Sequence, residues 1–204
     1  SSAVYGDHGK KQITEDMSVK PSSGYAVSKA EQEEAALRSF REEGLPVVIS
    51  RAFNNFAPGE GEHMFVSRLC AQIARIEAEG SGKLSIGPMH SCRDYIDTRD
   101  AVDAYIGLME KGTPGETYNV CSGKAVRIES LFQHLIDSAR VEIGYEIVRY
   151  DQKGNIPYQA GSFDKLHSLT GWEPRRDIME TLTAMLDDWR ERVRTGSQTG
   201  RTVI

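Results

Sequence analysis

The sequence predicts an α/β protein built on a doubly wound parallel sheet. A helical pattern of apolar residues begins near Tyr25 and stops at Gly44, and a buried strand is expected over residues 45–50. That strand contains an uninterrupted β-branched run, which is typical of parallel sheets covered on both faces. Helical and strand patterns then continue to alternate along the chain, as in doubly wound folds.

The later elements follow from the same periodicities. Helices are expected over residues 65–79, 98–109, 128–139 and 177–192, and short strands over 84–86 and 117–120. In the helix over 98–109 the apolar side chains that share one face are Val102, Tyr105, Ile106 and Met109. In the helix over 177–192 the side chains expected to point inward are Leu182, Met185, Leu186 and Trp189.

Composition excludes several classes of protein. The chain has 204 residues and a net charge of -5, with no concentrated stripe of Lys and Arg, so nucleic acid is not the expected partner. No apolar run is long enough to span a membrane, and no signal-peptide pattern is present, so we expect a cytoplasmic protein. The three cysteines lack the spacing of a zinc site, which predicts free thiols and no metal.

The chemistry of the chain is expected to centre on Tyr25 and Lys29. Their spacing places a phenol and an ammonium one turn apart on the same face of a helix. A nearby positive charge favours the phenolate, which suits a tyrosine that exchanges protons. Taken alone, the pair fits a solvated helix surface better than a catalytic site.

The residues upstream of Tyr25 and Lys29 favour a catalytic role for the pair. Residues 1–6, SSAVYG, together with the YAVSK stretch at residues 25–29, resemble the catalytic segments of the extended short-chain dehydrogenases/reductases. The resemblance implies that Ser1 hydrogen-bonds the substrate oxygen and that Tyr25 passes the proton. It also implies that Lys29 assists Tyr25 and holds the nicotinamide ribose, so that Tyr25 and Lys29 both contact the cofactor.

Further motifs extend this resemblance over almost the whole chain. Residues 51–59, RAFNNFAPG, imply that Phe53 borders the nicotinamide and Asn54 the substrate, although such a turn could also be structural. Residues 93–97, RDYID, imply that Arg93 contacts the nucleotide diphosphate, a task suited to a planar guanidinium. A surface ion pair is the alternative for Arg93, and Arg68 is a weaker candidate for a second phosphate contact.

The resemblance implies the C-terminal part of an NAD(P)-binding Rossmann fold plus a smaller α/β substrate lobe. Residues 1–61 are assigned to the second half of the Rossmann domain. Residues 62–194 are assigned mainly to the nucleotide-sugar lobe, with elements that return to the core, and residues 195–204 to a flexible tail. The cofactor is NADP or NAD, and its binding needs an N-terminal glycine-rich segment that this sequence lacks. The family also implies a homodimer.

Within that family the sequence looks most like the GDP-4-keto-6-deoxy-D-mannose reductases. Related GDP-mannose 4,6-dehydratases carry a glutamate two residues after the catalytic serine or threonine, where this chain has Ala3. Since alanine cannot accept a proton, the sequence favours reduction over dehydration. In the family an Arg-x-x-Asp pair binds the nucleotide ribose, and here Gln152 and Asn155 stand in those places. The sequence therefore does not determine the identity of the nucleotide.

The sequence leaves other functions open. A nucleotide-sugar 4-epimerase or a 4,6-dehydratase is the alternative within the family. A non-catalytic fragment or binding module is the alternative of another class, because no dinucleotide fingerprint is present.

Overall fold

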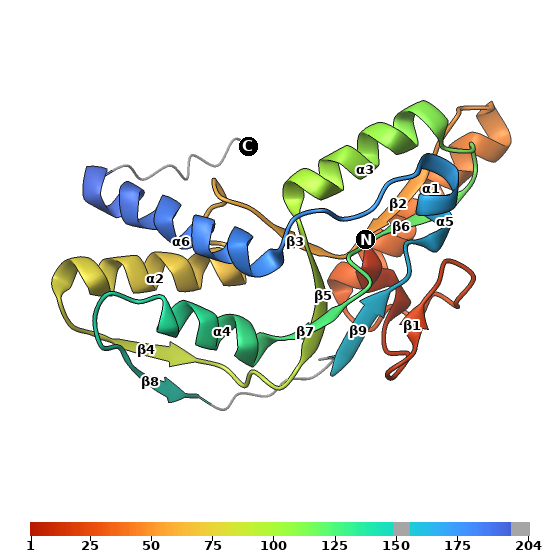
Figure 1. Ribbon diagram of the computed structural model, residues 1–204. Coiled ribbons are helices and arrows are strands. Elements are labelled where there is room, and N and C mark those ends of the chain that lie inside the picture. Colours follow the sequence, from red (N-terminus) through yellow and green to blue (C-terminus); the bar gives the residue numbers. More distant parts are fainter. Residues whose placement is uncertain (149–155, 197–204) are drawn as a thin grey trace. The chain divides into compact units, whose positions relative to one another are not determined.

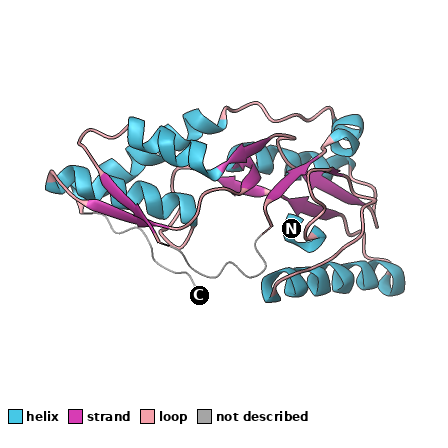
Figure 2. Cartoon of the chain, turned by 90° about the horizontal axis from the view of Figure 1, so that it is seen from below, coloured by secondary structure: helices cyan, strands magenta, loops and turns pink. Residues whose placement is uncertain are grey.

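A computed structural model describes residues 1–148 and 156–196 of the chain (Figure 1). The chain forms two compact units, which are considered separately below. In the described part, the first unit contains residues 1–55, 91–126 and 156–175, and the second contains residues 56–90, 127–148 and 176–196. Figure 2 shows that each unit combines helices with strands.

The first unit is built on parallel strands. A five-stranded sheet has the order β1-β9-β5-β3, with β7 also paired to β5, and β2 forms a separate pair with β6. The pairs β1 with β9, β5 with β9, and β2 with β6 all run parallel, which confirms the predicted α/β class. The strands are β1 (Gln12–Ile13), β2 (Ile49–Ala52), β3 (Asn54–Phe56), β5 (Cys92–Asp97), β6 (Thr117–Val120), β7 (Ala125–Arg127) and β9 (Tyr158–Gly161).

The helical elements of this unit are a short 3-10 helix and three α-helices. They are η1 (Ser2–Tyr5), α1 (Gly24–Glu43), α3 (Thr98–Lys111) and α5 (Asp164–Thr170). The side chain of Ser23 caps α1 by accepting a hydrogen bond from the backbone N–H of Ala26. The helix ends at Gly44, whose φ of 72° is the left-handed conformation that glycine adopts at low cost.

Two hydrophobic clusters form the core of the first unit. One is formed by η1 and β1 with Phe53 and Cys121, and the other lies between α3, β6 and α5. Helix α3 packs into the second cluster through Ala101, Ala104 and Leu108. The bulkier apolar face identified in the sequence is exposed instead: Val102, Tyr105, Ile106 and Met109 are 45%, 37%, 53% and 88% accessible.

The second unit packs three helices beside a two-stranded parallel sheet. Helix α6 lies against α2 and α4, and β4 pairs with β8. The four side chains of α6 that were expected to point inward are all buried. The elements are α2 (Phe65–Glu79), β4 (Lys83–Ile86), α4 (Ile128–Asp137), β8 (Gly144–Ile147) and α6 (Ile178–Thr195).

The element boundaries agree with the sequence-based predictions except at a few points. The strand expected over residues 45–50 is shifted, because the ladder with β6 begins only where Ile49 faces Thr117. Helix α6 includes Thr195, which had been assigned to a flexible tail, and residues 197–204 lie outside the described part. All three cysteines are free, as expected. None of the described helices is long and apolar enough to cross a membrane.

Candidate active site

Helix α1 presents Tyr25 and Lys29 on its first turns. The ammonium nitrogen of Lys29 lies 5.7 Å from the centre of the Tyr25 ring and donates a hydrogen bond to Oε1 of Gln32 at 3.0 Å. Tyr25 is 60% exposed, so its phenol is accessible to a bound molecule. The spacing in the sequence therefore does bring the two groups together, as the proton-transfer hypothesis requires.

Ser1 lies next to strand β2 of the same unit. Its backbone nitrogen donates to the carbonyl oxygen of Ser50 at 3.4 Å, and its hydroxyl accepts from the N–H of Ala3 at 3.4 Å. The 3-10 helix η1, which begins at the next residue, contacts α1. Ser1 is therefore near the α1 segment that carries Lys29.

Phe53 lies between β2 and β3, and Asn54 is the first residue of β3, but their surroundings differ. Phe53 is only 2% exposed and packs with Val4, Tyr5, Ile13 and Cys121. Asn54 is exposed, and its Nδ2 donates to the backbone oxygen of Asp94 at 3.2 Å. Phe53 thus has a packing role in this structure, while its expected contact with a nicotinamide stays a prediction.

Arg93 and Asp94 lie side by side on β5. Nη1 of Arg93 donates to the carbonyl oxygen of Cys92 at 3.0 Å, and burial lowers the pKa of the guanidinium from its usual value. The carboxylate of Asp94 is fully buried and accepts hydrogen bonds from Ser122, Gly123 and Gly161. Asp94 therefore holds the backbone of Ser122, Gly123 and Gly161 in place.

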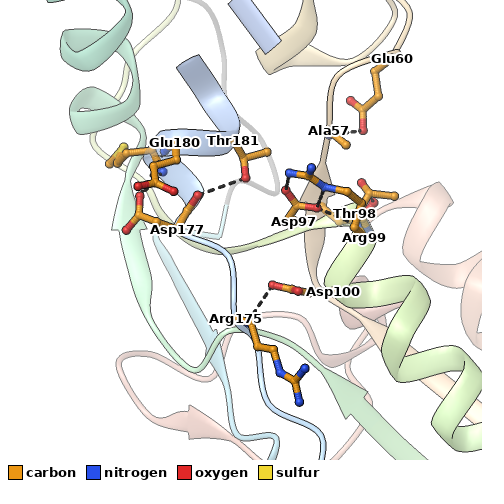
Figure 3. Close-up of polar contacts among 12 residues, drawn as sticks. Ala57, Glu60, Asp97, Thr98, Arg99, Asp100, Arg175, Asp177, Glu180 and Thr181 are labelled. Carbon is orange, nitrogen blue, oxygen red and sulfur yellow. Dashed lines mark hydrogen bonds and ion pairs between the residues drawn. The ribbon is translucent and has the colours of Figure 1, made fainter. Parts of the chain in front are cut away.

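The next acidic residues hold the start of α3. The carboxylate of Asp97 caps the helix through the backbone N–H of Arg99 and forms an ion pair with the guanidinium of Arg99 (Figure 3). Asp100 accepts a hydrogen bond from the backbone N–H of Arg175 at 3.0 Å, as Figure 3 also shows. These carboxylates serve the architecture of the first unit.

The remaining candidates lie elsewhere. Arg68 is an exposed residue of α2 in the second unit, where its charge acts on Glu62. Gln152 and Asn155 lie outside the described residues. Among residues 1–148 and 156–196, no group of three or more His, Cys, Asp or Glu side chains is arranged to hold a metal ion.

The sequence-based reasoning missed a buried ion pair beside the candidate site. Glu33 lies one turn after Lys29 on α1 and is bound by Arg51 of β2. Each residue has a recognisable position in the sequence. Glu33 follows Lys29 by four positions, and Arg51 is the first residue of the RAFN segment. Because both residues lie next to the proposed catalytic motifs and carry opposite charges, an ion pair between them could have been suggested from the sequence.

Comparison with known proteins identifies the family of the chain. A family model described as GDP-mannose 4,6 dehydratase matches residues 1–185. The chain belongs to this family. The GDP-mannose 4,6 dehydratase family assignment confirms the resemblance to nucleotide-sugar enzymes of the extended short-chain dehydrogenase/reductase type that the motifs indicated.

Individual members of the family are similar over most of the chain. GDP-6-deoxy-D-mannose reductase of Pseudomonas aeruginosa is 36% identical over 200 residues, which are 95% of this chain and 65% of the reductase. The dTDP-glucose 4,6-dehydratase of Escherichia coli is 26% identical, covering 92% of this chain and 56% of that enzyme. The chain thus spans less than two thirds of these relatives.

A solved structure shares the fold. The structure of RMD from Pseudomonas aeruginosa, complexed with NADPH, superimposes with a TM-score of 0.84 at 34% identity. The match covers 94% of this chain and 65% of that chain.

Proposed function

We propose that this chain carries the catalytic and substrate-binding residues of an NAD(P)-dependent nucleotide-sugar reductase. The reaction is the reduction at C4 of a 4-keto-6-deoxy sugar linked to GDP. The observation that carries the proposal is the exposed phenol of Tyr25 next to the ammonium of Lys29 at the start of α1. The 36% identity to a GDP-6-deoxy-D-mannose reductase supports the choice of substrate.

The proposed roles follow from the chemistry of the side chains. Reduction of a ketone needs a hydride at carbon and a proton at oxygen, and a bound reduced nicotinamide supplies the hydride. Tyr25 gives its phenolic proton to the C4 oxygen, and Ser1 donates a hydrogen bond to the same oxygen. Lys29 stabilises the phenolate that remains and hydrogen-bonds the ribose of the cofactor.

The remaining binding roles come from the family resemblance. Phe53 borders the nicotinamide and Asn54 the substrate, while Arg93 and Arg68 contact the diphosphate. An ammonium and a phenol on one exposed helical face fit the hydroxyl groups of a ribose, so the residues present fit NADP or NAD. In dinucleotide-binding folds of this kind, a glycine-rich turn binds the cofactor pyrophosphate. From the family resemblance alone, we also infer a homodimer.

The alanine at position 3 favours reduction over dehydration. Loss of water from the hexose requires a base for the C5 proton, which the dehydratases take from a glutamate at this place. Ala3 lies in η1, directly beside Ser1, and has no group that accepts a proton. The site therefore contains what C4 reduction needs and lacks the base expected for elimination.

Mass spectrometry of the sugar tests the proposal. The natural-length protein should convert a GDP-linked 4-keto-6-deoxyhexose to a product two mass units heavier when reduced nicotinamide is present. With the parent GDP-hexose and oxidised nicotinamide it should not release water. Loss of water would refute the reductase assignment, an isobaric product would indicate an epimerase, and binding without any turnover would indicate a binding module.

A further inference from the structure

A buried ion pair ties α1 to strand β2. Nε of Arg51 donates to Oε2 of Glu33 at 3.0 Å, and Nη2 of Arg51 donates to Oε1, so the ion pair is bidentate. The two side chains are only 7% and 12% exposed. Because Ala26 is the only fully buried residue of α1, this pair is a principal side-chain link between the helix and the strand.

Contacts with the ring of Tyr5 also hold the Arg51 guanidinium in place. Its guanidinium lies over the ring of Tyr5, 4.6 Å from the ring centre, and the Tyr5 hydroxyl donates to Oδ1 of Asn119 at 2.7 Å. The amide of Asn119 in turn donates to the backbone oxygens of Ile13 and Ser162. Burial opposes the charge of Arg51, but the hydrogen bonds that it donates to Glu33 raise its pKa above the usual value, so it remains a cation.

Glu33 has a second cation within reach on its own helix. Lys29 precedes it by four positions, the spacing at which lysine and glutamate pair on a helix. In the structure Glu33 is instead taken by Arg51, while Lys29 bonds Gln32 and stays beside the Tyr25 ring. The Glu33 carboxylate, which could otherwise pair with Lys29, is therefore bound by Arg51.

We propose that Arg51 is a positioning residue that keeps Glu33 away from Lys29 and so leaves the Lys29 ammonium available to Tyr25. Without Arg51, Glu33 is a partly buried carboxylate with no partner, which is costly, and pairing with Lys29 relieves that cost. The consequence for cofactor binding rests on the proposed function, whereas the consequence for Lys29 itself does not.

Two substitutions separate this role from a purely structural one. Arg51→Met and Glu33→Gln both break the ion pair and both lower stability, but only Arg51→Met leaves a charged Glu33 without its partner. In the natural-length enzyme, Arg51→Met should raise the KM for the nicotinamide cofactor about tenfold, whereas Glu33→Gln should change it less than about twofold. The double variant should recover most of the loss, since the competing carboxylate is gone. Equal effects of the two single variants, without recovery in the double variant, would overturn the proposal.

The reactivity of Lys29 gives a readout that needs no enzymatic activity. The protein is treated with acetic anhydride at limiting concentration, and acetylation of Lys29 is followed by peptide mass spectrometry. Arg51→Met should slow the reaction several-fold because Glu33 then holds the amine, and Glu33→Gln should not. Unchanged reactivity in Arg51→Met overturns the proposal even if the natural-length protein proves inactive on ketosugars.

Matched controls complete the experiment. Arg41 and Glu34 form a similar pair on α1, but their side chains are 53% and 54% exposed. Arg41→Met and Glu34→Gln should leave both readouts unchanged. If Arg51→Met does not fold, Arg51→Gln serves instead, because a neutral amide does not balance the charge of Glu33. It should slow Lys29 acetylation to a smaller extent, and wild-type reactivity in this variant would again overturn the proposal.

Discussion

Asp94 and Ser122 are joined by two hydrogen bonds to a single oxygen. The backbone N–H and the hydroxyl of Ser122 both donate to Oδ1 of Asp94 at 2.7 Å. The other oxygen, Oδ2, accepts from the backbone N–H groups of Gly123 and Gly161 at 3.0 and 3.1 Å. One buried carboxylate thus links β5 to β9 and to the turn after β6, and the backbone oxygen of the same residue accepts a hydrogen bond from Asn54.

Replacing Asp94 with asparagine should destabilise the protein markedly. The amide keeps one oxygen, but its NH₂ group would face N–H donors, so two buried donors lose their partner. Each such loss costs about 1–3 kcal/mol, and we expect the free energy of unfolding at pH 7 to fall by about 2–3 kcal/mol or more. Urea unfolding measures it. Ser122→Ala, which removes only one hydroxyl, is the control, and an equal effect of both substitutions would contradict the central role of Asp94.

The same carboxylate should make stability depend on pH. Burial raises the pKa of Asp94 to about 6, although its hydrogen bonds oppose the shift. The folded state then holds a proton more tightly than the unfolded state, so the contribution to stability is present below the unfolded pKa and is lost as pH rises through about 6. Between pH 4 and 7 the wild type should lose up to about 3 kcal/mol more than Asp94→Asn. A wild type that gains stability relative to the variant over this range would show that the hydrogen bonds outweigh burial.

A buried arginine should dominate the stability of the second unit. Arg190 of α6 donates two hydrogen bonds to the carboxylate of Glu77 of α2 and a third to the backbone oxygen of Ser138. Its side chain is 13% exposed and that of Glu77 is 7% exposed. Arg190→Met leaves Glu77 charged and buried, so we expect a loss of about 3–5 kcal/mol in urea unfolding. Arg194→Met, in a pair exposed by 72% and 59%, should have no measurable effect.

The sequence predicted elements well where one local signal dominates. Helix α2 spans Phe65–Glu79, the range that its periodicity predicted. In α3, however, two neighbouring stripes can both face a core. The bulky stripe that includes Ile106 predicts one orientation, whereas the smaller stripe of Ala101 and Ala104 allows the closer approach that the structure adopts. Periodicity alone cannot choose between two such faces.

The polar supports of the candidate site could not be predicted from local patterns. Tyr25 and Lys29 lie on one helix, so their spacing suffices to bring them together. By contrast, Glu33 meets Arg51 across an α-helix and a strand, and Asp94 meets Gly161 from a distant strand. Such contacts depend on the sheet topology, which the sequence defines only as a class. The resemblance to known enzymes predicts which groups react but not which residues hold them in place.

Arg93 is expected to bind the diphosphate of the substrate. Replacing it with alanine in the natural-length enzyme should weaken nucleotide-sugar binding by about 1.5–3 kcal/mol, the value of a hydrogen bond to a charged group. Calorimetric titration with a GDP-sugar measures the change. Arg99→Ala is the control, because Arg99 is 56% exposed and already bound to Asp97. Unchanged affinity in Arg93→Ala would identify Arg93 as a structural residue of β5.

Removal of the Tyr25 hydroxyl should abolish the reduction while leaving the fold intact. The phenol is the proposed proton donor to the C4 oxygen, and it lies on an exposed turn where phenylalanine fits without repacking. Loss of a general acid lowers kcat by a factor of about 10²–10⁴, and we expect Tyr25→Phe to fall in that range. The cofactor KM should rise less than kcat falls, because Lys29 keeps its contact with the ribose when the contact of the phenol is lost. Tyr105→Phe, on the exposed face of α3, is the matched control and should retain full activity. If Tyr25→Phe keeps wild-type kcat for the ketosugar, another group donates the proton and the catalytic assignment of α1 is wrong.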